Sequence, residues 1–452
     1  MLSTAPIGKL LFRLAAPAIA AQLVNALYNI VDRIYIGHME PDGDLALTGL
    51  GVCFAILMFI SAMAVLAGMG GGPRASIAMG EGDRDKAEAY LGGSFTMLLV
   101  MAVVATAVFQ IWKEPLLLAF GADASTVGYA TDYLSVYLWG SVAVLISLGL
   151  NTYITIQGRS GIAMCTTLIG AVVNIALDPL FIFGFHMGVK GAALATVIAQ
   201  TVSALWVLRF LTGRKTLLRL RLRHIRLKPS VIGPIAALGI SPFIMQATES
   251  LVSVSFNSSL LKYGGTPAVG AMTICSSVMQ IVWLPSQGLS QGAQPIISYN
   301  FGAGNFDRVK KAYRLLALSL MVYMVTATLF VELFPSLPVA LFNDDPTLTA
   351  IARRAVRIYM AGMALFWIQS ASQNSFVALG QAKLSLFFAL FRKVLLLIPL
   401  IFLLPHLFAD RVAGVLVAEP IADVVSALTC GAVFLWRLPH IIEQRRKTLS
   451  GQ

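Results

Sequence analysis

A few ionisable and amide side chains stand inside long apolar stretches of this sequence. Asp32 lies about five residues before the end of one stretch, and Asn174 and Asp178 lie four residues apart in another. In lipid, a charged side chain at a helix centre costs about 2.5–3.5 kcal/mol on insertion scales, so each such residue needs a compensating role. Because residues four apart share a helix face, Asn174 and Asp178 can act on one ligand.

These residues fall at similar depths if each apolar stretch is a membrane helix. At about 1.5 Å rise per residue, their distances from the outer helix ends place them in one region. The expected cluster is Asp32, Asp178, Tyr133 and Thr196 in one layer, Asn174 one turn deeper and Asn151 deeper again. Two carboxylates beside amides and hydroxyls could share a proton, since proximity and desolvation favour the protonated form. They could equally hold Na⁺ through their oxygens.

Each acid also has a structural interpretation. Asp32 next to Arg33 could form an interfacial ion pair, and Asp178 before Pro179 could mark a kink. In the second half of the chain, one apolar stretch carries Glu419 and Asp423, and the stretch before it carries Arg392 and Lys393. We expect a buried salt bridge between these neighbours, with a second proton relay as the alternative.

The composition predicts an all-α integral membrane protein that positions these groups. Of 452 residues, 58% are hydrophobic and 12% charged, about half the charge of a soluble domain. About 20 apolar residues span a bilayer. The twelve predicted spans are 11–37, 49–72, 90–112, 128–156, 160–184, 190–211, 232–261, 267–290, 312–334, 355–378, 384–405 and 412–436.

Net charge +12 is concentrated in three regions that alternating topology places on one side: 209–228, 308–314 and 437–447. The positive-inside rule puts both termini in the cytoplasm, and the basic middle loop should contact anionic lipid rather than nucleic acid. The sequence has no catalytic triad, metal cluster or nucleotide motif, so we expect no enzyme activity and no cofactor other than a coupling H⁺ or Na⁺.

The chain contains an internal repeat. Pro17 recurs as Pro242, and a glycine-rich turn containing Gly70 and Pro73 recurs 222 positions later as Gly292 and Pro295. The residues of 191–205 recur 223 later in 414–428. The copies divide near residue 225, giving lobes of 1–225 and 226–452. Each has an even number of spans, so they are parallel repeats, which predicts a transporter.

The repeated turns, the matched prolines, and the segments 29–37 and 174–179 resemble the multidrug and toxic compound extrusion (MATE) family. They are most similar to its DinF-like branch, in particular MepA-type members. The resemblance covers essentially the whole chain. It implies a V-shaped pair of six-helix lobes in the bacterial cytoplasmic membrane, acting as a multidrug efflux antiporter driven by protons or sodium ions. The cluster around Asp32 and Asp178 matches the branch's cation site, and Pro17 matches a proline associated with helix bending. A static kink is the alternative.

The two copies differ in their acids. Asp32 aligns with Asn257 and Asp178 with Ile398, so the titrating site is expected only in the N-terminal lobe. Glu249 resembles a cation-site glutamate of the NorM-like branch, but its aspartate partner is missing from 366–374. We therefore expect Glu249 to meet a cationic substrate.

Aromatic, methionine and glutamine side chains could hold flat cationic drugs. The candidate substrate-facing residues are Glu249, Met245, Gln246, Phe256, Met279, Gln280, Trp283, Phe366, Trp367 and Gln369. We expect a monomer that exports cationic amphipathic drugs by alternating access. A flippase for lipid-linked or polysaccharide precursors and a non-transporting membrane scaffold are the other interpretations.

Overall fold

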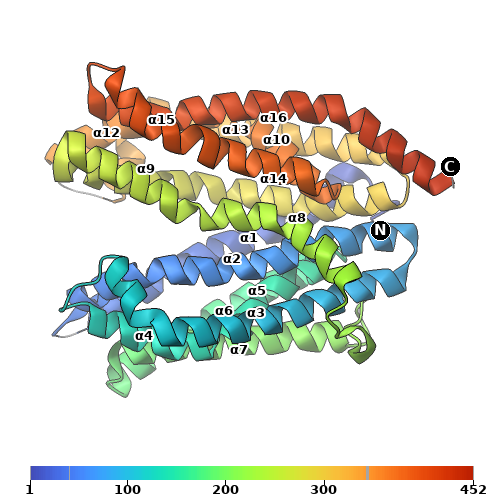
Figure 1. Cartoon of the computed structure of the whole chain (residues 1–452), viewed down its shortest axis with the longest axis horizontal. Helices are drawn as coiled ribbons and strands as arrows, with labels where there is room; N and C mark the ends of the chain where they lie inside the picture. The colour runs from blue at the N-terminus through green and yellow to red at the C-terminus, as the bar shows by residue number, and fades with distance from the viewer. Residues whose placement is uncertain (1, 40, 343–345, 451–452) are drawn as a thin grey trace. The chain divides into compact units, whose positions relative to one another are not determined.

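A computed structural model describes residues 2–39, 41–342 and 346–450, and this part of the chain is helical, without strands (Figure 1). The elements of the first half are α1 (Ile7–Gly37), α2 (Gly43–Glu81), α3 (Arg84–Ala119), α4 (Val127–Trp139), α5 (Ser141–Thr155), α6 (Ser160–Pro179), the π-helical η1 (Leu180–Gly184), α7 (Gly188–Thr212) and the short 3₁₀ turn η2 (Leu222–His224).

The second half repeats the pattern with more interruptions. Its elements are α8 (Pro229–Ala247), α9 (Glu249–Gly302), α10 (Phe306–Leu333), α11 (Ser336–Ala340), α12 (Pro346–Met360), α13 (Met363–Ala378), α14 (Ala382–Leu390), the π-helical η3 (Phe391–Leu397), α15 (Ile398–Leu403), the 3₁₀ turn η4 (Leu404–His406) and α16 (Arg411–Ser450).

The described helices account for all twelve predicted spans. Nine helical stretches are long and apolar enough to cross a membrane, and the bent pair α4–α5 makes a tenth. One of the nine runs over 74 residues, Pro229–Gly302, and would measure about 110 Å if straight. Gly265, with φ 67°, divides it into two spans. The predicted span 355–378 corresponds to α12 and α13, which are separate short helices.

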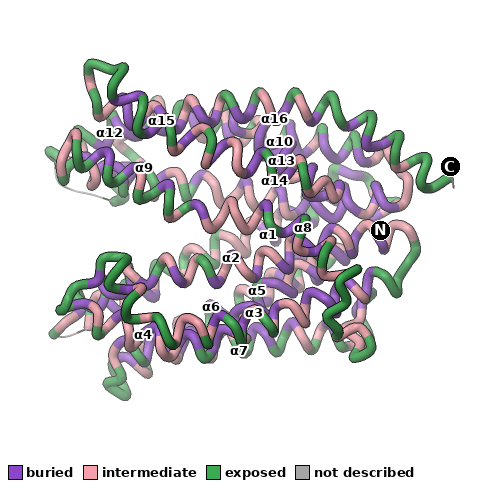
Figure 2. The backbone as a smooth tube through the Cα atoms, viewed as in Figure 1, coloured by how far each residue is buried: buried purple, intermediate pink, exposed green. Residues whose placement is uncertain are grey.

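The chain folds into two compact units, which we call the N-unit (Ala16–Gln246) and the C-unit (Met1–Ala15 with Ala247–Gln452). Each has its own apolar core, drawn purple along the helices in Figure 2. Large apolar side chains such as Ile111, Trp139 and Leu435 are exposed, as expected for helices that face acyl chains.

The compact units do not coincide with the sequence copies at the start of each copy. The N-terminal residues of the first copy, up to Ala15, belong to the C-unit, and those of the second copy, up to Gln246, belong to the N-unit. The start of α1 packs in the C-unit, where a Cβ on Gly292 would lie 2.5 Å from the Ala15 Cα. Almost all of α8 packs in the N-unit, where a Cβ on Gly239 would lie 1.9 Å from the Leu66 oxygen. Only glycine permits backbones to approach so closely. The division at residue 225 thus separates the two sequence copies, whereas the boundaries of the compact units depend on which helices pack closely at glycine residues.

This contact predicts a specific loss of stability in the N-unit. Gly239→Ala places a methyl group against the backbone of α2, and overpacking of this kind costs about 1–3 kcal/mol. Gly233→Ala is the matched control, because it lies on the same helix with no atom within 4 Å of its Cβ position. The apparent melting temperature of the purified protein should fall for Gly239→Ala and stay equal or rise for Gly233→Ala. Equal melting temperatures would contradict the close approach.

Candidate functional site

Asp32 on α1 and Asp178 on α6 come together inside the N-unit. Asp32 is 8% exposed and Asp178 is fully buried. Their carboxyl groups lie within hydrogen-bonding reach of each other. Two ionised carboxylates have no hydrogen to share and repel each other, so this geometry requires a proton between them or a cation beside them.

Amide and hydroxyl groups surround the pair. The Asn174 amide donates to Asp178 Oδ1 at 3.2 Å and to Thr196 Oγ1 at 3.3 Å. The Tyr133 hydroxyl lies close to the Thr196 hydroxyl, and its ring stacks on Tyr137 with centroids 6.0 Å apart. The structure therefore brings together the residues that a common depth predicts, and their role in ion binding stays a prediction.

Three oxygens of this cluster are buried without a hydrogen-bond partner: Asp32 Oδ1, Asn174 Oδ1 and Asp178 Oδ2. Buried polar atoms in folded proteins are normally paired. Unpaired oxygens within one cluster make a site that can accept a proton or a small hard cation. The described residues contain no group of three or more His, Cys, Asp and Glu side chains that could hold a metal ion.

Two further residues, Tyr28 and Gln200, belong to this cluster and were not predicted from the sequence. The Tyr28 hydroxyl lies near both carboxyl groups and near the Gln200 side chain. Gln200 also accepts a hydrogen bond from Ser147 at 2.6 Å. Helical spacing could have identified both residues, because Tyr28 is four residues before Asp32 and Gln200 is four residues after Thr196. Residues four apart lie on the same face of a helix.

Asn151 lies apart from the carboxyl pair. Its amide donates to the Ala163 carbonyl at 3.1 Å. Ala163 precedes Asn174 by eleven residues on α6, a distance of about 16 Å along the helix. The expectation that Asn151 is deeper holds, but the structure gives it no contact with the acids.

Pro17 stands inside the continuous helix α1, next to the point where this helix passes from the C-unit to the N-unit. Without an N–H, proline cannot donate to the carbonyl one turn earlier, so the helix is weakened there. The position suits a hinge, and that role also stays a prediction.

The C-unit contains the predicted salt bridge. Arg392 on η3 donates to Asp423 on α16 at 2.6 and 2.9 Å and to Glu419 at 2.7 Å. Lys393 pairs with Glu249 on α9, and its charge also acts on Glu419 and Asp423. Adjacent residues of a helix point in different directions, which separates the two cations. The Glu249 side chain is nevertheless 65% exposed, so one side of it is free to meet a ligand.

The expected drug-facing residues differ in exposure. Phe256 and Phe366 are buried in the core of the C-unit, where Phe256 packs against Tyr359 and Phe366 lies under the Arg392 guanidinium. Gln369 is buried beside them on α13. The partly or fully accessible members are Met279, Gln280, Trp283 and Trp367 in the C-unit and Met245 and Gln246 in the N-unit.

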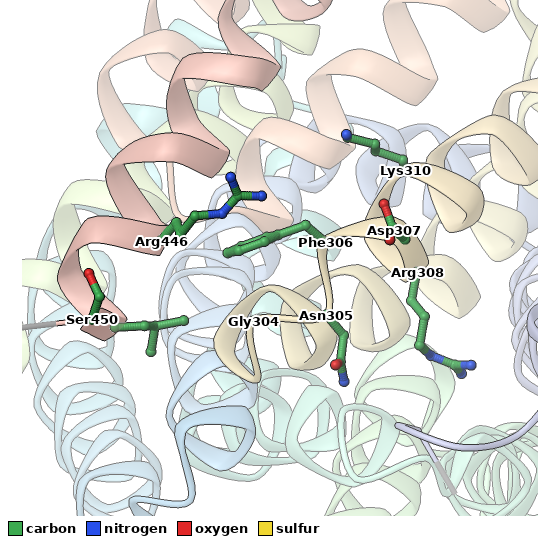
Figure 3. Close-up of a pocket in the computed structure, with 9 residues that line it drawn as sticks. Gly304, Asn305, Phe306, Asp307, Arg308, Lys310, Arg446 and Ser450 are labelled. Carbon is green, nitrogen blue, oxygen red and sulfur yellow. The ribbon is translucent and has the colours of Figure 1, made fainter.

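A separate pocket of about 690 Å³ lies in the C-unit, between the α9–α10 turn and the end of α16 (Figure 3). Its charged lining comprises Asp307, Arg308, Lys310 and Arg446. Arg446 pairs with Glu443 and lies over the Phe306 ring. None of the predicted site residues lines this pocket.

Comparison with known proteins identifies this architecture. The MatE family model matches residues 17–180 and 242–403, which are most of the chain and correspond to one segment in each sequence copy. The chain belongs to the MatE family. As a family member it is a membrane transporter rather than an enzyme.

Its similarity to individual MatE proteins extends over almost the whole chain. It is 26% identical over 422 residues to the multidrug export protein MepA of Staphylococcus haemolyticus (strain JCSC1435), covering 93% of this chain and 92% of the relative. It is also 26% identical to MepA of Staphylococcus aureus (strain N315), covering 94% and 92%. A crystal structure of MATE in the bent conformation superimposes with TM-score 0.91 at 22% identity, covering 98% of both chains.

A shared proton in the carboxyl pair predicts selective chemical labelling. Apolar carbodiimides react with protonated carboxyl groups in apolar surroundings, so peptide mapping by mass spectrometry should find the adduct on Asp32 or Asp178 near neutral pH. The exposed Asp44 provides an internal control and should stay unlabelled. Asn replacement of both acids should remove the adduct from these peptides. Equal labelling of Asp44 and the pair would show that the pair holds no proton.

Proposed function

We propose that this MatE protein is a proton-coupled multidrug efflux antiporter that exports cationic amphipathic drugs. The observation that supports it best is the buried pair Asp32–Asp178 with three unpartnered oxygens around it. Such a site gains or loses charge when it releases or takes up an ion, which is the requirement for coupling to an ion gradient. The names of the MepA relatives supply the multidrug export.

The cycle alternates between two states of the carboxyl pair. A proton enters from outside and is shared by the two carboxyl groups, which lowers the charge of the pair from −2 to −1, while drug is released. Proton loss to the cytoplasm restores the charge and permits drug to rebind. One charge moving through 100 mV yields about 2.3 kcal/mol, enough to bias an equilibrium about fiftyfold. Pro17, beside the transition of α1 between units, is the proposed hinge. Na⁺ is the alternative coupling ion, held by the same oxygens.

The protein is proposed to act as a monomer in the bacterial cytoplasmic membrane. Its basic regions, including Arg219–Lys228 and the α16 end, support cytoplasmic placement of both termini. Glu88, 1% exposed, pairs with Arg221 and holds part of this loop against α3. Anionic lipid headgroups are the expected partners of the remaining basic side chains.

A flippase for lipid-linked precursors is the second candidate. It would need a basic site for pyrophosphate, whereas the N-unit cluster contains two acids and no cation that pairs with them among its hydrogen-bonding partners. A membrane scaffold would leave this cluster without a purpose, because the buried acids carry an energetic cost.

Replacing either acid tests the proposed site. Asp32→Asn and Asp178→Asn retain shape and remove the titrating group, so efflux of a cationic dye such as ethidium from a pump-deficient bacterium should fall at least tenfold. Asp44→Asn is the control for removal of an exposed acid and should behave as wild type. Expression is compared by immunoblot. Wild-type efflux and drug resistance in both site variants would exclude the site.

The coupling ion is tested separately in the wild-type protein. A protonophore should collapse dye efflux, and replacing Na⁺ with choline should leave the rate within about twofold, because a proton shared by the two carboxyl groups removes their mutual repulsion without Na⁺. Loss of efflux on sodium removal, with the proton gradient intact, would instead assign Na⁺ as the coupling ion. Efflux that resists both treatments would contradict ion coupling.

A further inference from the structure

One acid of the C-unit is accessible, while the charges around it are buried. The Glu249 side chain on α9 is 65% exposed, whereas the Lys393 side chain that pairs with it is 8% exposed. Arg392, Glu419 and Asp423 are buried on η3 and α16. We call these five residues the C-unit ion cluster. Of the five, only Glu249 is exposed and open to a ligand.

The buried charges of this cluster balance one another. Arg392 and Lys393 supply two positive charges, and Glu419 and Asp423 supply two negative charges. Arg392 donates to both buried acids, and the charge of Lys393 acts on both. Compensation of this kind is what an apolar interior requires. The charge of Glu249 is therefore additional to the buried set, and Lys393 is shared between that set and Glu249.

The buried acids retain acceptors for an ammonium group. Arg392 engages Glu419 Oε1 and Asp423 Oδ1, and Glu419 Oε2 and Asp423 Oδ2 are buried without a hydrogen-bond partner. An unpaired buried acceptor is costly, and a lysine carries three donors on a flexible four-carbon stem. Movement of Lys393 Nζ from Glu249 toward these oxygens would satisfy them and leave Glu249 open.

The pair of Glu249 and Lys393 belongs to the second sequence copy alone. The repeated prolines align the copies at an offset of 225 in the first helix and 220 in the fifth. At these offsets Glu249 corresponds to Val24 and Lys393 to Val173. The first copy forms its bundle with two apolar residues at these positions, so the fold itself does not require the ion pair.

An accessible aromatic ring adjoins the same cluster. The Phe366 ring centre lies 4.6 Å from the Arg392 guanidinium, and the Trp283 ring lies 5.2 Å from Phe366, centre to centre. Trp283 is half-buried, so part of its surface is available to a ligand. Aromatic faces attract cations. Together with the Glu249 carboxylate, this surface suits a flat aromatic cation.

We propose that Lys393 is a displaceable internal cation that occupies Glu249 when no substrate is bound. An aromatic cationic drug binds the Glu249 carboxylate, and the Lys393 ammonium moves to the unpaired oxygens of Glu419 and Asp423. When the drug leaves, Lys393 returns to Glu249. No covalent bond forms or breaks, because only the partners of the ion pairs change.

Competition by Lys393 has two consequences for a drug. Binding is weaker than it would be to an open carboxylate, since the drug must displace a cation that the protein supplies. Release is easier, because Lys393 replaces the departing cation and Glu249 is not left with an uncompensated charge. A neutral compound cannot replace Lys393 on Glu249, so the pair also selects cations over neutral molecules.

The biological use of this competition rests on the proposed export of cationic drugs. The competition itself is a binding equilibrium in the C-unit that needs no ion gradient and does not involve Asp32 or Asp178. It is therefore measurable apart from transport.

Equilibrium dye binding tests the competition. The dissociation constant of ethidium is measured by fluorescence anisotropy with the full-length protein in lipid nanodiscs. Lys393→Met removes the ammonium at similar length, so ethidium should bind about fivefold more tightly, the equivalent of one partly exposed ion pair. Lys310→Met removes an exposed lysine of the same unit and should bind as wild type does. Equal or weaker binding to Lys393→Met overturns the proposal.

A second variant and a neutral dye protect this comparison from structural effects. Lys393→Gln carries the same expectation and replaces Lys393→Met if that protein does not elute as a monodisperse peak. The neutral dye Nile red should bind wild type and Lys393→Met alike, because it does not compete with an ammonium group. Equal tightening of Nile red and ethidium would indicate a loosened site and overturn the proposal.

Removing the acid tests the place of binding. Glu249→Gln should weaken ethidium binding about tenfold, as expected for loss of a charged partner. Adding Lys393→Met to Glu249→Gln should then have no further effect, because the two cations no longer share a carboxylate. Tightening by Lys393→Met that persists without Glu249 would contradict displacement from this acid.

A double-mutant cycle tests where Lys393 moves. Glu419→Gln removes one acceptor of the displaced ammonium, so it should weaken ethidium binding to the protein that retains Lys393. In the Lys393→Met protein only the direct effect of the lost charge remains, and the loss should be about threefold smaller. Equal losses in both backgrounds overturn the movement of Lys393 toward Glu419 and Asp423.

Failure of this inference is distinguishable from failure of the proposed function. Equal ethidium affinities of wild type and Lys393→Met would overturn the displacement and leave ion coupling at Asp32 and Asp178 intact. Wild-type efflux by Asp32→Asn and Asp178→Asn would contradict the proposed function and leave the binding comparison unaffected. If both proposals hold, Lys393→Met should bind ethidium more tightly and yet export it more slowly, because release is slowed.

Discussion

The cost of burying charge in an apolar helical bundle governs the polar interior of this transporter. Every acid that is removed from water must be neutralised by a proton, a cation or a protein base, since desolvation otherwise exceeds the available stabilisation. The two units meet this requirement in different ways. The N-unit brings Asp32 and Asp178 together with amide and hydroxyl groups, and the charge of Arg33 also acts on Asp32. In the C-unit, Arg392 pairs with Glu419 and Asp423, and Lys393 pairs with Glu249.

Close packing between helices stabilises the two units that contain these buried sites. Lipid provides little hydrophobic drive for helix association, so close contacts between backbones contribute much of the stability. Gly239 allows α8 to approach α2, and Gly292 allows the N-terminal part of α1 to approach α9. Both contacts join the start of one sequence copy to the unit built mainly from the other. Movement in α1 near Pro17 would therefore occur in a helix anchored at one end in the C-unit and carrying Asp32 in the N-unit.

The two sequence copies differ at a few buried positions, and these differences give the two units different polar interiors. The same helix positions hold Thr196 and Gln200 in one copy and Glu419 and Asp423 in the other. Neutral partners around acids favour a site whose charge is set by the coupling ion, whereas acids around a fixed Arg392 give a mostly compensated network. The duplication provides the frame, and a few substitutions on facing helices decide the electrostatics.

Composition and periodicity by themselves determined the class, the helices and the repeat. Apolar runs long enough for a bilayer can form only helices or closed barrels in lipid, and their length and turn residues gave the twelve spans. Spacing also predicted the meeting of Asp32, Asp178, Tyr133 and Thr196, because depth along a helix follows from residue number at a constant rise. The Arg392 salt bridge with Glu419 and Asp423 was predictable for the same reason.

Only the tertiary structure decided the lateral contacts. Residue number gives depth but leaves the rotation of each helix and its neighbours undefined. That is why Asn151 lies away from the acids, and why the pairing of Lys393 with Glu249 was not predicted. It is also why Tyr28 and Gln200 were not predicted as members of the cluster. Burial of Phe256 and Phe366 in the core was equally hidden, since aromatic residues suit both packing and ligand binding. The boundaries of the compact units depend on which helices approach each other closely at glycine residues. Such contacts exist only once the helices have packed.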